Sequence, residues 1–142
     1  ENIMLHIINN SSKNNQLIAN NVGRVALKAF FRLAELWDVN QSQQSNLLGG
    51  VDRATINRWK KKIEKNEEIH LGKDVLDRLS CILGIHKALR IIYSDKKIAY
   101  GWIKRKSPIF SNKAPIDFIE ADGSIFSIYT VRQYLDQLRG GN

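Results

Sequence analysis

Apolar positions recur at three- and four-residue steps along most of the chain, and this spacing is typical of amphipathic α-helices. The pattern predicts a first helix from Val22 to about Asp38. Its core face is expected to carry Val25, Ala29, Phe30, Leu33, Leu36 and Trp37, with Arg24, Lys28 and Arg32 on the opposite face. Residues 9–21 are rich in Asn and Ser, which favour caps and turns, so we expect residues 1–21 to form a flexible lead-in.

A second helical pair is predicted after a short polar segment. Residues Gln41 to Leu48 lead into Gly49-Gly50, and Asp52 can cap the helix that follows by accepting from its free amides. In that helix Ile56 and Trp59 are spaced to face inward. Its exposed side then carries polar and basic residues: Arg53, Thr55, Asn57, Arg58 and Lys61. A helix, a short helix, a glycine turn and a second amphipathic helix are typical of a helix-turn-helix.

The chemistry of this exposed side suits DNA. Lysine and arginine neutralise phosphates, while Asn57, Thr55 and the arginines can hydrogen-bond base edges in the major groove. The alternative is a charged helix that is merely solvated. The segment resembles the Xre-like helix-turn-helix, whose leucine-leucine-glycine-valine turn leads to a helix ending in arginine-tryptophan-lysine. It departs from that pattern because Gly49-Gly50 stands where the family has one glycine.

The second half of the sequence predicts a broad-faced helix followed by a compact helical tail. From Asp74 to Tyr93 the apolar band is too wide for a helix with one covered side, so we expect it to be buried on two sides. That band consists of Val75, Leu76, Leu79, Ile82, Leu83, Leu89 and Ile92. After it we predict a short helix over 97–104, a loop over 107–113, a short helix from Pro115 to Gly123, and a final helix ending before Gly140. Trp102 and Phe110 are expected in the core.

Composition places the chain among globular proteins and suggests a polyanionic partner. The 142 residues are 43% hydrophobic and carry a formal net charge of +8, divided equally between residues 1–67 and 68–142. The one cysteine, Cys81, lies in an apolar pattern and is expected to be a buried thiol. No run is long enough to span a membrane, so we expect a soluble, cytoplasmic protein. The sequence begins at Glu1, which suggests a trimmed or partial chain.

Catalysis and metal binding find no support in the sequence. No nucleophile and base stand in a recognisable arrangement, and no glycine-rich phosphate loop precedes a helix. His86 has no second ligand at metal spacing and is expected to pack in the apolar band. We therefore expect no enzyme, no metal site and no cofactor.

The chain from Asp74 onward resembles the toxin-binding domain of the MbcA/ParS/Xre antitoxins. The matching motifs are Asp74-Val75-Leu76-Asp77-Arg78-Leu79-Ser80, Leu83-Gly84-Ile85, Ala88-Leu89, Trp102-Ile103, Phe110 with Pro115-Ile116-Asp117, Gly123, Val131-Arg132-Gln133-Tyr134-Leu135-Asp136 and Arg139-Gly140-Gly141. Two departures lie in one loop: the family's proline-asparagine is replaced around Lys106-Ser107, and its glycine before the short helix is Asn112.

This resemblance implies an all-α antitoxin of a type II toxin–antitoxin pair, with an N-terminal helix-turn-helix followed by a small helical toxin-binding domain. The expected division is a lead-in over 1–21, the helix-turn-helix over 22–67 and the toxin-binding domain over 68–142. The implied partners are a cognate RES-domain toxin that consumes NAD, held in a hetero-oligomer, and operator DNA bound by a homodimer. The residues expected to meet the toxin are Asn112, Lys113, Arg132, Arg139, Gly140, Gly141 and Asn142. The alternative is a solitary repressor whose C-terminal domain only dimerises.

Overall fold

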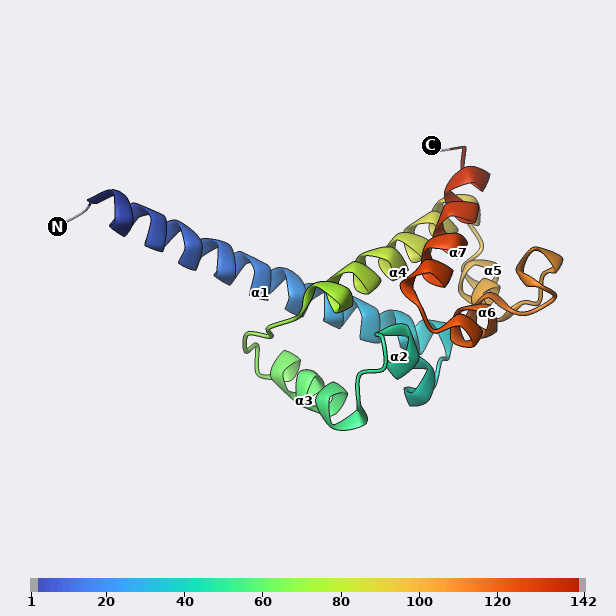
Figure 1. The fold of residues 1–142 in the computed structure, drawn as a ribbon. Coiled ribbons are helices and arrows are strands. Elements are labelled where there is room, and N and C mark those ends of the chain that lie inside the picture. Colours follow the sequence, from blue (N-terminus) through green and yellow to red (C-terminus); the bar gives the residue numbers. More distant parts are fainter. Residues whose placement is uncertain (1–2, 141–142) are drawn as a thin grey trace.

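The computed structural model describes residues 3–140, with the side chains of Met4 and of residues 21–140. Within this part of the chain every regular element is a helix, which confirms the all-α class (Figure 1). The α-helices are α1 (Ile3–Trp37), α2 (Gln41–Leu47), α3 (Arg53–Glu64), α4 (Lys73–Ile92), α5 (Lys96–Gly101), α6 (Pro115–Asp122) and α7 (Ile125–Leu138), with 3-10 turns η1 (Trp102–Lys104) and η2 (Pro108–Phe110).

Helix α1 corrects two predictions. The flexible lead-in was wrong for residues 3–21, which continue α1 as helix and extend away from the body of the molecule (Figure 1). Capping residues such as Asn and Ser lower helix propensity only slightly, and a packed downstream segment can propagate the helix through them. The core face is also different: Val25 is 63% exposed and Ala29 is exposed. The residues that α1 buries are Leu27, Phe30, Leu33, Ala34 and Trp37.

Two tight caps separate α1, α2 and α3. Helix α1 ends at Asp38, whose φ of +53° lies in the left-handed region. Asn40 then caps α2 reciprocally: its side chain accepts from the Gln43 amide at 2.8 Å, and the Gln43 side chain accepts from the Asn40 amide at 2.8 Å. This capping box satisfies free amides of the first turn and fixes where α2 begins.

Helix α4 is the central element of the fold. It packs on α1 along one side and on α7 along another, as its wide apolar band predicted. Its buried residues are Arg78, Leu79, Cys81, Ile82, Ile85, Ala88 and Leu89. The linker into α4 is also anchored, because Ile69 and Leu71 are buried and Leu71 lies against Gly23 of α1. One hydrophobic core therefore runs across the expected boundary at residues 67 and 68.

Aromatic side chains hold the tail together. The Trp102 ring lies edge-on to Phe110 at 6.0 Å and is stacked with Tyr134 of α7 at 6.4 Å. Phe110 also contacts Phe118 of α6 at 5.3 Å. Trp102 and Phe110 are buried, as predicted. This cluster joins η1, η2, α6 and α7 into one unit around the end of α4.

The remaining core expectations hold. Cys81 is buried, and that burial raises the pKa of its thiol. His86 is half-buried and stacks on Tyr100 at 5.7 Å. No helix among the described residues is long and apolar enough to cross a membrane.

Candidate nucleic-acid interface and partner surface

The turn between α2 and α3 uses both of its glycines. Gly49 has φ of +92° and Gly50 has φ of +87°, a region that side chains other than glycine rarely adopt. The turn is closed by Ser45, whose Oγ donates to the Val51 carbonyl at 2.6 Å and whose carbonyl accepts from the Gly50 amide at 2.8 Å. The second glycine is therefore built into an ordered turn.

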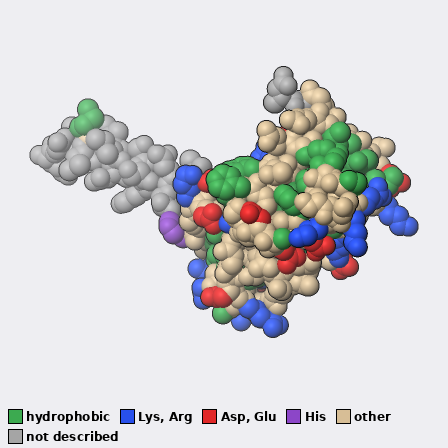
Figure 2. All heavy atoms as spheres, turned by 45° about the vertical axis from the view of Figure 1, so that its right-hand side comes forward, with side chains coloured by type: hydrophobic (Ala, Val, Ile, Leu, Met, Phe, Trp, Pro, Cys, Tyr) green, Lys and Arg blue, Asp and Glu red, His purple; other side chains and the backbone are tan. Residues whose placement is uncertain are grey.

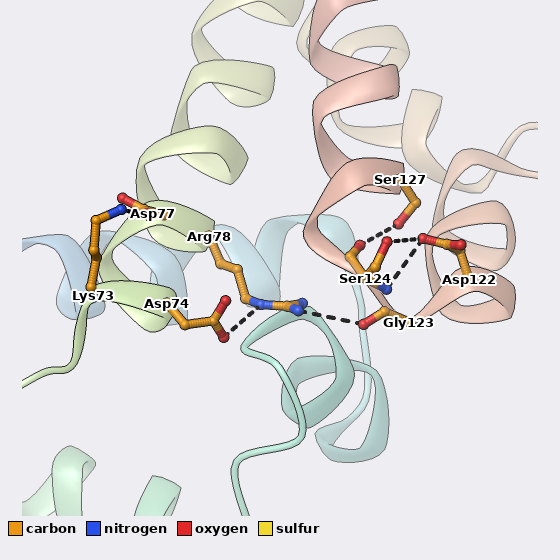
Figure 3. A network of polar contacts seen from close by, with 8 residues as sticks. All are labelled: Lys73, Asp74, Asp77, Arg78, Asp122, Gly123, Ser124 and Ser127. Carbon is orange, nitrogen blue, oxygen red and sulfur yellow. Dashed lines mark hydrogen bonds and ion pairs between the residues drawn. The ribbon is translucent and has the colours of Figure 1, made fainter.

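Arg78 of α4 connects this turn to the rest of the protein (Figure 3). A Cβ on Gly49 would lie 2.8 Å from Asp74 Oδ2 and 2.9 Å from Arg78 Nε, so the turn packs directly on this ion pair. Arg78 Nε donates to Asp74 at 3.0 Å, and Arg78 Nη2 donates to the Gly123 carbonyl at 3.4 Å. The buried guanidinium thus holds together the helix-turn-helix, α4 and the turn between α6 and α7.

Helix α3 is fixed at its start and along its inner face. The Asp52 side chain accepts from the Thr55 amide at 2.7 Å, which confirms the predicted cap. This hydrogen bond holds the pKa of Asp52 below its ordinary value, so the carboxylate stays ionised beside the positive helix end. Ile56 is fully buried and Trp59 packs partly buried against the core.

The opposite face of α3 presents the residues predicted to bind DNA. Arg53, Asn57, Arg58 and Lys61 are exposed, and Thr55 is half-buried. Arg58 Nη2 donates to Thr55 Oγ1 at 3.2 Å, so this pair is oriented before any ligand binds. The structure brings all five residues onto one helix.

Helix α2 adds residues that the sequence interpretation missed. Gln41 Nε2 donates to Asn57 Oδ1 at 3.3 Å, and Gln41, Ser42, Ser45 and Arg53 line a groove of about 310 Å³ between α2 and α3. The glutamine-rich run at the start of α2 was the available signal. Lys60, by contrast, lies over the Phe31 ring at 5.0 Å and covers α1 instead of joining the exposed face.

The loop around η2 holds Asn112 and Lys113 in a defined shape. Ser111 and Asn112 have φ of +59° and +62°, as predicted for Asn112, and both are exposed. The Ser107 amide donates to the Lys113 carbonyl at 3.1 Å, which closes the loop at its base. Phe110 anchors it in the aromatic cluster, so Asn112 and Lys113 form a rigid protrusion.

The predicted arginines of α7 have different environments. Arg132 packs over Gly84, where an added Cβ would lie 2.5 Å from Arg132 Cζ, and its Nη1 donates to the Ser80 carbonyl at 3.5 Å. It therefore positions α7 on α4 as well as being partly exposed. Arg139 Nη1 lies 3.9 Å from Asp136 Oδ1 near the helix end.

Gly140 has φ of +76° just past α7, as predicted, while Gly141 and Asn142 lie outside the described residues. The structure does not bring the predicted partner residues into one cluster. The η2 loop projects beside α5 and α6, whereas α7 ends elsewhere, near the C-terminus (Figure 1).

Exposed apolar side chains on the C-terminal half were also missed. Phe126 is 74% and Tyr129 is 44% exposed on the outer face of α7, and Ile109 in η2 is 56% exposed. Figure 2 shows hydrophobic side chains gathered on the face it turns forward, with Lys and Arg side chains beside them. The helical spacing of Phe126 and Tyr129, opposite Ile128 and Val131, could have revealed them. Within the described part of the chain no group of His, Cys, Asp or Glu is arranged to hold a metal ion.

Comparison with known proteins gives two family matches that together cover most of the chain. Residues 16–84 match the antitoxin Xre-like helix-turn-helix domain, and residues 88–141 match the antitoxin Xre/MbcA/ParS C-terminal toxin-binding domain. An uncharacterized protein of Sinorhizobium fredii (strain NBRC 101917 / NGR234), y4oB, is 41% identical over 115 residues, which cover 81% of this chain and 84% of that protein. No solved structure matches the chain.

These matches agree with the geometry. The helix-turn-helix match spans the α2–α3 unit with its exposed basic helix, and it continues into α4, which supports that unit. The toxin-binding match covers the tail held by the aromatic cluster, and it favours an antitoxin over a solitary repressor. The chain belongs to the Xre/MbcA/ParS family of antitoxins, with a DNA-binding helix-turn-helix and a C-terminal toxin-binding domain.

Proposed function

We propose that this antitoxin neutralises a cognate RES-domain toxin that consumes NAD, and that it represses its own operon in the cytoplasm. In this proposal the C-terminal end of α7 covers the toxin's active-site entrance, and a homodimer binds palindromic operator DNA through α3. The observation that carries the proposal is the pairing of the two family domains in one chain. The face of α3 lies well away from the C-terminal end of α7, so DNA and toxin can be bound at the same time (Figure 1).

The DNA half of the proposal is supported by charge and exposure. Helix α3 carries five basic residues and one acidic residue. Four of the five predicted contact residues are exposed on it. Phosphate contacts supply affinity that falls with salt, whereas Asn57 and the arginines can discriminate bases.

A gel-shift titration with operator DNA tests this assignment. Replacing Arg53, Asn57 and Arg58 together by alanine is expected to lower operator affinity at least about a hundredfold, because two phosphate or base contacts and one amide contact are lost per protomer. Lys87→Ala removes an exposed charge on α4 and serves as the control, with affinity expected near wild type. Unchanged operator binding by the triple variant would show that α3 does not contact DNA.

The toxin half is supported by the chemistry of the C-terminal end. Arg132, Arg139 and the following glycines give a slender basic segment, and such a segment can enter a cleft that accepts the pyrophosphate of NAD. Arg139 is exposed and Gly140 leaves the helix in a left-handed conformation, so the end of α7 is free to enter such a cleft.

An NAD-hydrolysis assay with the purified RES-domain protein encoded beside this chain tests the toxin half. Truncation before Arg139 is expected to abolish inhibition, and Arg139→Glu should weaken it through charge reversal at full length. Phe110 and Trp102 are untouched in both variants, so circular dichroism should report an unchanged fold. Full inhibition by the truncated chain would overturn the proposed role of this end.

A further inference from the structure

An apolar groove lies on the side of α1 that faces away from the core. Val22, Val25, Ala26 and Ala29 of α1, together with Leu83 of α4, line a groove of about 390 Å³ with Asn21 as its polar neighbour. Val22 is 57% and Val25 is 63% exposed. Since α1 buries its other apolar side in the core, this is a second apolar face on the same helix.

The N-terminal half of α1 leaves the body of the protein as an extended helix (Figure 1). Isolated helices are marginal in water and gain most of their stability from packing an apolar face. In the sequence, the four- and three-residue spacing of Ala29, Val25 and Val22 continues backwards through Ile18, Asn15, Ser11, Ile8 and Met4. This is the seven-residue repeat of a helix that pairs with another helix, and Met4 is 65% exposed.

The arm formed by residues 3–18 cannot fill the groove of its own chain, because both belong to one continuous helix. An antiparallel second copy can fill it. In that register Met4 stands opposite Ala29 and Ile8 opposite Val25, so the larger arm residues meet the small residues of the groove. A parallel pairing would set Ala29 against Ala29 and leave the groove hollow.

Charge permits this pairing. Between residues 2 and 23 the only formally charged residue is Lys13, so two arms can approach without strong repulsion. A twofold-symmetric contact also uses the same surface on both copies, which a repeat read in opposite directions provides.

We propose that α1 forms an antiparallel pair with α1 of a second copy, the arm of each chain lying in the groove made by Val22, Val25, Ala29 and Leu83 of the other. This surface would supply the homodimer on which the proposed operator binding rests.

Analytical ultracentrifugation of the full chain tests the surface. The wild type is expected to sediment as a dimer, and Val25→Glu should weaken dimerisation at least about a hundredfold, because a charge enters an apolar contact twice per dimer. Ile91→Glu alters an apolar residue of α4 that is 54% exposed and lies outside the groove, and it should remain dimeric. A monomeric wild type, or a Val25→Glu variant that stays dimeric, would overturn the proposed surface.

Cysteine cross-linking tests the direction of the pair. Mixed Ile8→Cys and Val25→Cys chains should form a disulfide-linked heterodimer on oxidation, and Val25→Cys alone should not cross-link. The native Cys81 is buried and does not compete. Rapid cross-linking of Val25→Cys alone would demonstrate a parallel pair and contradict the register. Toxin inhibition measured on the same variants separates the outcomes: a monomeric chain that still inhibits toxin overturns the dimer surface and leaves the antitoxin function standing.

Discussion

Arg78 is the residue whose removal should affect the fold most at a single polar position. Its side chain is 9% exposed and joins Asp74, the Gly123 carbonyl and the Gly49 turn. Arg78→Ala removes a charge-assisted hydrogen bond to a part-buried carbonyl, worth about 1.5–3 kcal/mol, and the packing of the buried stem, worth about 1 kcal/mol. Asp74 is 64% exposed and is re-solvated at little cost. We expect the free energy of unfolding to fall by about 3 kcal/mol in total.

Urea unfolding followed by circular dichroism measures this loss. For a chain of this size, 3 kcal/mol also corresponds to a Tm lower by about 10 °C. The control is Lys73→Ala, which removes the Lys73–Asp77 pair one residue earlier on α4, where the lysine side chain is 89% exposed (Figure 3). That variant should unfold at the wild-type midpoint. If Arg78→Ala and Lys73→Ala behaved alike, with equal urea slopes, Arg78 would not connect the two halves of the protein.

Three further predictions concern α3, α4 and α7. Gly84→Ala should destabilise the wild type by crowding Arg132 but not the Arg132→Ala background, giving a coupling of about 1 kcal/mol or more in a double-mutant cycle of thermal unfolding. Arg58→Ala should reduce operator affinity and lower the salt slope of binding by about one, whereas Lys60→Ala, which loses only its contact with the Phe31 ring, should preserve that slope. Burial lowers the pKa of His86 below its ordinary 6.5, so the folded state binds fewer protons and the free energy of unfolding should decrease as the pH falls below 6.5; His86→Gln should remove that part of the pH dependence measured by chemical denaturation.

The sequence predicted the fold well where a local signal was strong. The Asp52 cap, the turn glycines, the end of α6 at Gly123 and the two-sided burial of α4 all follow from residue types and spacing, and the structure confirms them. Each depends on neighbours a few residues apart, which is the range over which capping and periodicity act.

Predictions failed where a distant contact decides the outcome. An Asp and an Arg four residues apart indicate a surface pair, yet Arg78 is buried because Gly49 and Gly123 close over it. The apolar residues of α1 could not be divided between its two faces from spacing alone, so Val25 was assigned to the core. The predicted partner residues likewise lie on separate segments, because the η2 loop and the end of α7 leave the aromatic cluster in different directions (Figure 1).

The central claim, that one chain binds a RES-domain toxin through its tail and DNA through α3, is tested most directly by cellular NAD. The neighbouring RES-domain protein would be expressed with the wild-type chain, with the chain truncated before Arg139, or with the Arg53, Asn57 and Arg58 alanine variant. We predict that NAD stays at its normal level with the wild type and with the α3 variant, and falls with the truncated chain. A fall in NAD in the presence of the wild-type chain, at matched protein levels, would contradict the account.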